Sequence, residues 1–290
     1  MFINGCISIF IFRCRVVQKS LETLSDKEIF PLLAEFHGNV IACIHDQNGN
    51  HVMQKCIEVM STKAKRARSN GSMYSAQIDF IIKDVLSNVE ALSCHPYGCR
   101  VLQRMLEHCV DEQRVKVLDQ VKSSHRVLLD DQYGNYVIQH VLQFGRSSDR
   151  DSILEIVIEN GLLSMSRQKF ASNVVEKLLK YGSSSQRNAI VREMLKVSYL
   201  NFINYLSSLR RALSNHTFAT HKTQPPKEND SEIGNHSIVL LMVRDAYANY
   251  VVQTTLDVVP EGTERRDLLE ELNKNAAQLV SKQLWIMFWD

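Results

Sequence analysis

Six short stretches of the chain each carry three polar residues in one fixed arrangement. The first and last of the three are four residues apart, and the second directly follows the first. On a helix, residues four apart lie one turn apart on the same face, and the second residue lies about 100° round from the first. The six trios are Cys14/Arg15/Gln18, Asn50/His51/Gln54, Cys99/Arg100/Gln103, Asn135/Tyr136/Gln139, Ser172/Asn173/Glu176 and Asn249/Tyr250/Gln253.

The residue types in the trios suit contact with unpaired bases of a nucleic acid. Except for Asn173, the second member is Arg, His or Tyr, and flat groups of this kind stack on bases. The outer members are a short amide, thiol or hydroxyl and a Gln or Glu, whose donors and acceptors can read the edges of bases. A helix face that only contacts solvent would carry Lys and Glu instead. A single Asn/Gln pair on a helix would by itself indicate only solvent exposure. Six trios that agree in residue type and spacing instead favour contact with bases.

The spacing of the trios predicts the elements that position them. The last members are separated by 36 residues from Gln18 to Gln54, by 36 from Gln103 to Gln139 and by 37 from Gln139 to Glu176. Two intervals are longer, with 49 residues from Gln54 to Gln103 and 77 from Glu176 to Gln253. A period in this range indicates stacked helical units that bury their apolar faces against their neighbours.

Three further columns of the repeat support this interpretation. Two apolar residues precede each last member, as in Val137-Ile138, and continue at helical spacing as a core stripe. Asp46, Asp131 and Asp245 stand where an N-cap is expected. A small residue comes directly before the first member of five trios, where it would allow close packing at the helix start, whereas Arg13 precedes Cys14. The small residues are Gly49, Gly98, Gly134, Ala171 and Ala248.

With these trios, the chain resembles the Pumilio-type (PUF) RNA-binding repeat family over roughly residues 10–278. The resemblance implies an all-α fold, a curved right-handed α-solenoid of about 36-residue repeats, with residues 1–290 forming one domain of about six repeats. Family members usually carry eight repeats, and the trios match the third to the eighth. The two N-terminal repeats and part of the C-terminal cap are therefore expected to be missing, which would weaken binding.

The resemblance also implies a base sequence, because in the family Asn with Gln reads uracil, Cys or Ser with Gln reads adenine, and Ser with Glu reads guanine. The chemistry is consistent, since a carboxylate accepts from the two N–H donors of guanine and an amide both donates and accepts. The RNA runs antiparallel to the protein in the family, so the predicted site is 5′-UGUAUA-3′. The outer trio members would contact base edges, and Arg15, His51, Arg100, Tyr136, Asn173 and Tyr250 would stack between bases.

As in the family, the protein is expected to bind 3′-untranslated elements of messenger RNA that contain UGUA. It would repress translation or promote decay by recruiting deadenylation or translation-repression factors, as a cytoplasmic monomer with no cofactor. The net charge of +2 and the pI of about 8.1 add little, so this interpretation rests on the trios. The seven cysteines show no zinc-binding spacing, so no metal site is expected and a reducing compartment is indicated.

Four segments depart from the repeat. Residues 1–12 are apolar but too short for a membrane span and lack a small-residue cleavage site for a signal peptide. Residues 61–72 are basic and predict a solvated loop, with phosphate contact or an import signal as alternatives. Residues 199–237 predict an insertion, helical at first and then disordered, and residues 280–290 an irregular end.

Two other functions compete with RNA binding. Armadillo or HEAT solenoids are also helical repeats, but their peptide grooves give no reason for Cys, Asn or Ser to alternate in step with Gln or Glu. An enzyme is disfavoured because the sequence has no Gly-rich phosphate loop, nucleophile elbow or metal-ligand cluster, and no catalytic residue is expected.

Overall fold

The computed structural model describes residues 14–67, 69–196 and 237–275. Its elements in these ranges are all helices, which confirms the predicted all-α repeat architecture. The chain divides into two compact units, residues 1–153 and 154–290. The expectation of a single domain stays a prediction.

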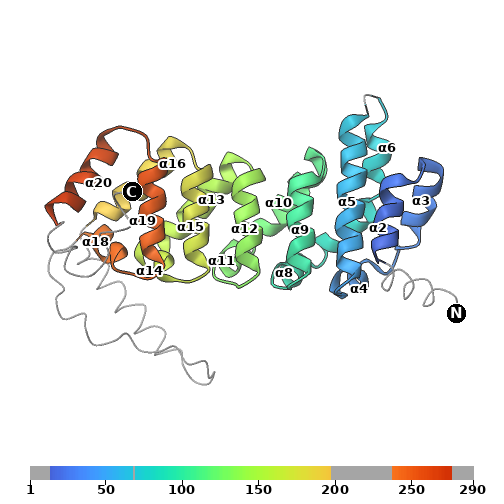
Figure 1. The fold of residues 1–290 in the computed structure, drawn as a ribbon, viewed down its shortest axis with the longest axis horizontal. Coiled ribbons are helices and arrows are strands. Elements are labelled where there is room, and N and C mark those ends of the chain that lie inside the picture. Colours follow the sequence, from blue (N-terminus) through green and yellow to red (C-terminus); the bar gives the residue numbers. More distant parts are fainter. Residues whose placement is uncertain (1–13, 68, 197–236, 276–290) are drawn as a thin grey trace, which may run out of the picture. The chain divides into compact units, whose positions relative to one another are not determined.

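In the first unit, one helix of each repeat carries a trio, and these trio helices pack side by side in chain order (Figure 1). The trio helices are α2 (Cys14–Thr23), α5 (Gly49–Arg66), α9 (Gly98–His108) and α12 (Gly134–Phe144). The helices between them are α3 (Asp26–Ala34), α4 (Val40–His45), α6 (Gly71–Ala76), α7 (Asp79–Leu86), α8 (Val89–Ser93), α10 (Asp111–Lys122) and α11 (His125–Leu128). Helix α13 (Ser147–Glu159) begins in this unit and ends in the next.

The second unit repeats the same order of helices. Its trio helices, α15 (Ala171–Tyr181) and α19 (Ala248–Val258), pack against each other. Short helices α14 (Leu162–Arg167) and α18 (Ile238–Val243) precede them, and α16 (Ser184–Leu195) and α20 (Thr263–Lys274) follow them. Helices α16 and α20 are also in contact. The two repeats of this unit therefore pack through two layers of helices, the trio helices and the helices that follow them.

The core of each unit is the apolar stripe that the sequence predicts. Val52, Met53 and Ile57 of α5 are fully or almost fully buried. The stripes of α9, α12, α15 and α19 behave in the same way. Burial of one Val, Leu or Ile side chain contributes about 1.5–3 kcal/mol, so these stripes hold each helix to its neighbours.

Glycine at the start of a trio helix is explained by close approach to the short helix before it. A Cβ at Gly49 would lie 2.5 Å from the carbonyl oxygen of Cys43, and one at Gly98 would lie 2.5 Å from that of Leu92. At Gly134 the nearest atom would be a methyl carbon of Leu128 at 2.9 Å. The predicted tight entry is confirmed at these three positions, where a larger residue would push the helices apart.

The aspartates before the trio helices bond as predicted but stand in a different place. Helix α5 has Asn48 at its N-cap, so Asp46 lies two residues outside the position expected for it. Its Oδ1 accepts hydrogen bonds from the backbone N–H groups of Asn48 (2.8 Å) and Gly49 (2.7 Å). Asp131 and Asp245 bond in the same way. The carboxylate therefore closes the turn before the helix, because the turn itself supplies the N-cap residue.

The predicted basic loop at residues 61–72 is wrong for most of its length. Helix α5 continues to Arg66, and α6 begins at Gly71. Ser61 and Ala64 extend the buried stripe of α5 by another turn, which the basic residues Lys63, Lys65 and Arg66 in the same segment obscure. Lys63 forms an ion pair with Asp26 (2.7 Å), whose other oxygen accepts from the Tyr74 hydroxyl (2.8 Å). The added helix α6 is thereby tied to α3.

The remaining irregular segments fall largely outside the described residues. These are residues 1–12, the insertion at 199–237 with its expected helix and disordered half, of which only Ser237 is described, and residues 280–290. Within the described ranges, the structure has no helix with both the length and the apolar character needed to cross a membrane.

Candidate nucleic-acid interface

The three members of a trio differ in exposure, and the second member is the most exposed in every repeat. The first member is buried in the four trios from Asn50 to Ser172 and half-buried at Cys14 and Asn249. The last member is half-buried, except for Gln103, which is buried. The second member is exposed in all six trios: Arg15, His51, Arg100, Tyr136, Asn173 and Tyr250. Each trio therefore presents an exposed second residue beside a recessed pair.

In the three Asn/Gln trios, hydrogen bonds fix the orientation of both amides. The Asn50 Nδ2 donates to the backbone oxygens of Asp46 (3.0 Å) and Gln47 (2.8 Å), so its Oδ1 faces the next turn. That oxygen accepts a bond of 2.9 Å from the Gln54 Nε2. Asn135 and Gln139 repeat this arrangement. The Asn249 Nδ2 donates to the backbone oxygen of Asp245 (2.7 Å), and its Oδ1 accepts a longer bond of 3.4 Å from the Gln253 Nε2. The Gln therefore has one N–H donor and its Oε1 acceptor, side by side, available for a ligand.

The Cys99/Gln103 trio lacks this internal bond. The Cys99 Sγ lies 3.5 Å from the backbone oxygen of Pro96, and burial raises the pKa of the thiol, so it stays neutral. A thiol is a weak acceptor, and the Gln103 Nε2 is buried without a hydrogen-bond partner. Replacing Asn by Cys therefore leaves a smaller side chain and an amide that is not tied to its neighbour.

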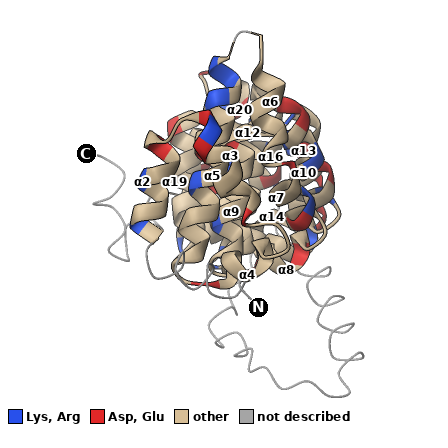
Figure 2. Ribbon diagram, turned by 90° about the vertical axis from the view of Figure 1, so that its right-hand side faces the viewer, with Lys and Arg blue, Asp and Glu red and all other residues tan. Residues whose placement is uncertain are grey.

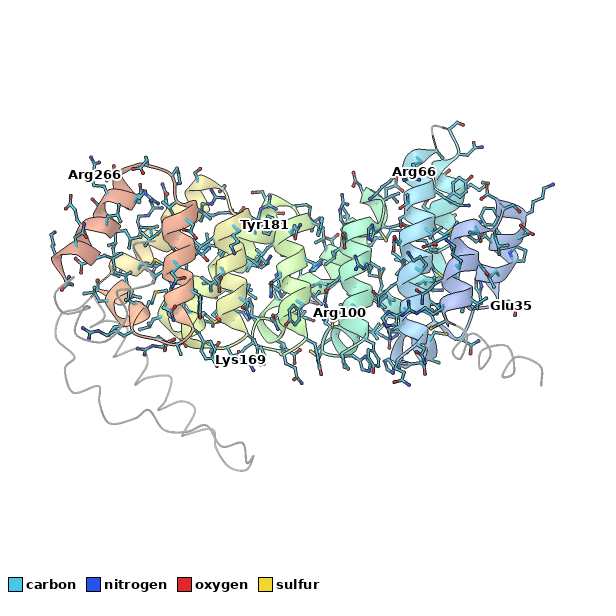
Figure 3. All side chains as sticks on the ribbon, in the orientation of Figure 1. Glu35, Arg66, Arg100, Lys169, Tyr181 and Arg266 are labelled. Atoms are coloured by element: carbon cyan, nitrogen blue, oxygen red, sulfur yellow. The ribbon has the colours of Figure 1, made fainter. Side chains whose placement is uncertain are left out.

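In the second unit, the Ser172/Glu176 trio presents a carboxylate. The Ser172 hydroxyl donates to the backbone oxygen of Lys169 (3.3 Å), and the Asn173 amide donates to the same oxygen (3.1 Å). One oxygen of Glu176, Oε2, accepts a bond of 3.2 Å from the hydroxyl of Thr254 on the neighbouring helix α19. Lys169 is labelled in Figure 3, at the turn before α15.

Two of the predicted stacking residues meet directly. The guanidinium carbon of Arg100, labelled in Figure 3, lies 5.5 Å from the centre of the Tyr136 ring. Their helices, α9 and α12, are neighbours, as are α2 and α5, and α5 and α9. Within the first unit, the structure therefore brings four trios onto successive packed helices. Within the second unit, it does the same for the trios of α15 and α19.

The charge near the trios is largely balanced. Lys55, which follows Gln54, forms ion pairs with Glu22 (3.2 Å) and Glu58 (3.1 Å). Arg104, which follows Gln103, pairs with Glu107 at 2.8 Å. Figure 2 shows basic and acidic residues interspersed on the ribbon. The chemistry of these trios is therefore that of amides and flat side chains more than of a strong positive field.

Sequence reasoning missed two residues that shape the trios. His95 stands in the aspartate column, and its Nδ1 accepts from the backbone N–H groups of Tyr97 (3.2 Å) and Gly98 (3.1 Å). Its position in the aligned repeat could have indicated this role. Thr254 could not have been found so directly, because its partner Glu176 lies in the preceding repeat.

No group of three or more potential metal ligands occurs among residues 14–67, 69–196 and 237–275. His216, His221 and His236 lie outside these ranges.

The helices and trios together define a helical-repeat protein that offers one set of base-sized contacts per repeat. The profile of the Pumilio-family RNA binding repeat matches residues 14–37, 39–67, 88–122, 131–158, 162–195 and 239–272. These segments make up more than half of the chain, and the chain belongs to this family. The family match decides against the armadillo or HEAT alternative.

Several relatives are similar over most of the chain. The suppressor protein MPT5 of Saccharomyces cerevisiae is 28% identical over 274 residues, covering 87% of this chain and 28% of that protein. A Pumilio domain-containing protein of Schizosaccharomyces pombe is 25% identical over 252 residues, covering 87% of this chain and 29% of its own length. The chain thus spans less than a third of the length of these two relatives.

Solved structures show the same similarity. PUF-8 in complex with PBE-RNA is 30% identical with a TM-score of 0.73, covering 97% of this chain and 68% of that one. The Puf3 RNA binding domain bound to a Cox17 RNA 3′ UTR recognition sequence is 31% identical with a TM-score of 0.68, covering 96% and 74%.

Proposed function

We propose that this protein binds single-stranded messenger RNA sequence-specifically, one base to a repeat, with 5′-UGUAUA-3′ as its preferred core. The observation that carries the proposal is the common build of the trios, in which a recessed pair stands beside an exposed second residue. A base could stack on the exposed residue while its edge meets the recessed pair. The RNA-bound states of PUF-8 and Puf3 support the same ligand class.

The base assigned to each repeat follows from the donors and acceptors that remain free. In the Asn/Gln trios, a free N–H and the Oε1 of Gln match the carbonyl and the N3–H of uracil. The Glu176 carboxylate offers only acceptors, which match the N1–H and N2–H groups of guanine. In the two Cys/Gln trios, the smaller thiol leaves room for adenine.

The regulatory role is proposed from the ligand. The similar Puf3 RNA binding domain is bound to a 3′ UTR recognition sequence, and by analogy this chain is proposed to act on messenger RNA in the cytoplasm. This chain would repress translation or promote decay through recruited deadenylation or translation-repression factors, as a monomer and without catalysis of its own. Its residues 14–18 would contact the last base of the core, and residues 249–253 would contact the first.

A competition titration with labelled RNA tests the proposal. The UGUAUA hexamer, flanked by cytosines, competes against six RNAs that each carry one changed base. Each change should weaken binding by about 1–3 kcal/mol, as for other mismatched sites. Equal binding of all seven RNAs, or no binding to any, would refute sequence-specific reading. Filter binding with a random RNA pool then shows whether UGUAUA is the preferred core.

A further inference from the structure

The hydroxyl of Thr254 donates to the carboxylate proposed to read guanine. Its Oγ1 lies 3.2 Å from Oε2 of Glu176, and this bond joins α19 to α15. Thr254 is 6% exposed, whereas Glu176 is half-buried. The hydroxyl therefore approaches the carboxylate from the protein side.

The bond of Thr254 is not the one that a threonine in a helix usually makes. Such a hydroxyl commonly donates to the carbonyl four residues earlier in its own helix. The next residue, Thr255, does this, with a bond of 2.7 Å to the backbone oxygen of Val251. Thr254 instead donates its proton across the helix interface to Glu176.

The same position in the other repeats holds a basic or imidazole side chain. The residues that follow the last trio member are Lys19, Lys55, Arg104, His140, Lys177 and Thr254. A lysine beside Glu176 would form an ion pair with its carboxylate and compete with a base for its oxygens. A hydroxyl supplies one neutral donor and leaves both oxygens with free lone pairs.

We infer that Thr254 is a positioning residue for specificity, which sets the Glu176 carboxylate to accept both N–H donors of guanine. The inference rests on the proposed function, because it assigns a task to the same repeat. A carboxylate held by one hydrogen bond loses less side-chain freedom when the base arrives, which favours binding of the matched base. Adenine offers no such pair of donors on its edge, so it gains nothing from this orientation.

The test compares variants on RNAs with G or A at the second base of UGUAUA. Thr254→Val removes the hydroxyl and keeps the shape of the side chain. It should weaken binding of the G-containing RNA about three- to tenfold, the range of a lost hydrogen bond, and change binding of the A-containing RNA less than about twofold. Thr254→Ser, which keeps the hydroxyl, should restore the G-over-A ratio. Thr254→Lys should lower that ratio as Thr254→Val does, and it serves as the test variant if Thr254→Val does not fold.

Two controls separate positioning from damage to the fold. Thr255→Val removes the neighbouring hydroxyl, which bonds within its own helix, and should leave the G-over-A ratio unchanged. The preference for U over C at the first base, assigned to Asn249 and Gln253, should also stay constant in every Thr254 variant. A change in that preference together with the G-over-A ratio would show a general disturbance of α19 and overturn the inference.

Glu176→Gln distinguishes the inference from the proposed function. It should lower the G-over-A ratio by about tenfold or more. If this ratio is unchanged, the proposed reading of guanine fails and the inference fails with it. If Glu176→Gln lowers the ratio but both Thr254→Val and Thr254→Lys leave it at the wild-type value, the proposed function stands and the inference alone is wrong.

Discussion

The guanidinium of Arg100 lies over the ring of Tyr136, 5.5 Å from its centre, across the interface of α9 and α12. A base between two flat groups needs van der Waals contact of about 3.5 Å on each side, or about 7 Å in total. Binding of a base here must therefore separate the two side chains. An exposed cation–π contact stabilises by about 0.5–1 kcal/mol, which stacking on both faces of a base can offset.

Tyr136→Ala should weaken RNA binding and lower the stability by no more than about 1 kcal/mol, the contribution of its contact with Arg100. Base stacking on an aromatic side chain contributes about 1–3 kcal/mol, and the Tyr136 side chain is 42% exposed, so its removal leaves the core intact. Fluorescence anisotropy with labelled UGUAUA RNA measures the loss. Tyr181→Ala, a change at the end of α15 outside the trios, is the matched control. Equal losses in the two variants would contradict a stacking role for Tyr136.

Gly98→Ala should destabilise the first unit. The added Cβ would lie 2.5 Å from the carbonyl oxygen of Leu92, so α8 and α9 must move apart, at a cost of about 1–3 kcal/mol. Urea unfolding followed by circular dichroism measures the free energy of unfolding. An unchanged midpoint would show that the close approach is not needed.

Stability should fall as the pH is lowered from about 6.5 to about 4, in part through His125. Burial lowers the pKa of this imidazole to about 4, with Asp149 opposing the shift and Lys122 adding to it. The unfolded chain then binds a proton that the folded chain does not, so the stabilisation present above pH 6.5 is lost as the pH falls. The loss approaches about 3 kcal/mol below pH 4.

His125→Leu isolates this effect, because the carboxylates of the chain titrate in both proteins. The free energy of unfolding of wild type minus that of the variant should decrease between pH 6.5 and pH 4. A difference that is constant over this range would show that His125 is not buried in its neutral form.

Arg187→Lys should destabilise the second unit by about 1–3 kcal/mol. The Arg187 guanidinium donates to three backbone oxygens at the ends of two trio helices, those of Leu179 (2.7 Å), Lys180 (2.9 Å) and Val258 (3.2 Å). A lysine keeps the charge but cannot form this planar fork. Thermal unfolding measures the change. The control is Arg192→Lys, at an exposed ion pair with Glu264, which should cost less than about 1 kcal/mol. An equal loss of stability in both variants would show that the hydrogen bonds of the Arg187 guanidinium do not stabilise the unit.

Much of the fold follows from local signals in the sequence. The apolar stripe of each trio helix is a periodic pattern, and burial follows it, as at Val137 and Ile138. The glycines before three trios of the first unit, Gly49, Gly98 and Gly134, indicate a close approach to the preceding short helix. The exposed second member and recessed outer members also follow from helical spacing, as Asn135, Tyr136 and Gln139 illustrate.

What the sequence could not predict depends on contacts between distant residues. The ion pair of Lys63 with Asp26 spans 37 positions and lies in a segment that the sequence predicts to be a basic loop but that is largely helical. The bond from Thr254 to Glu176 spans 78 positions, across the segment 197–236. His95 and Asp46 perform the same task with different side chains, which a pattern of residue types alone does not capture.

The measurement that tests one base per repeat most directly is a change of specificity in a single trio. Asn135→Ser with Gln139→Glu gives this repeat the outer members of the Ser172/Glu176 trio. In competition titrations, the double variant should prefer G over U at the third base of UGUAUA, by about 1–3 kcal/mol, with the preferences at the other five bases unchanged. A retained preference for U, or a loss of preference at every base, would contradict the account.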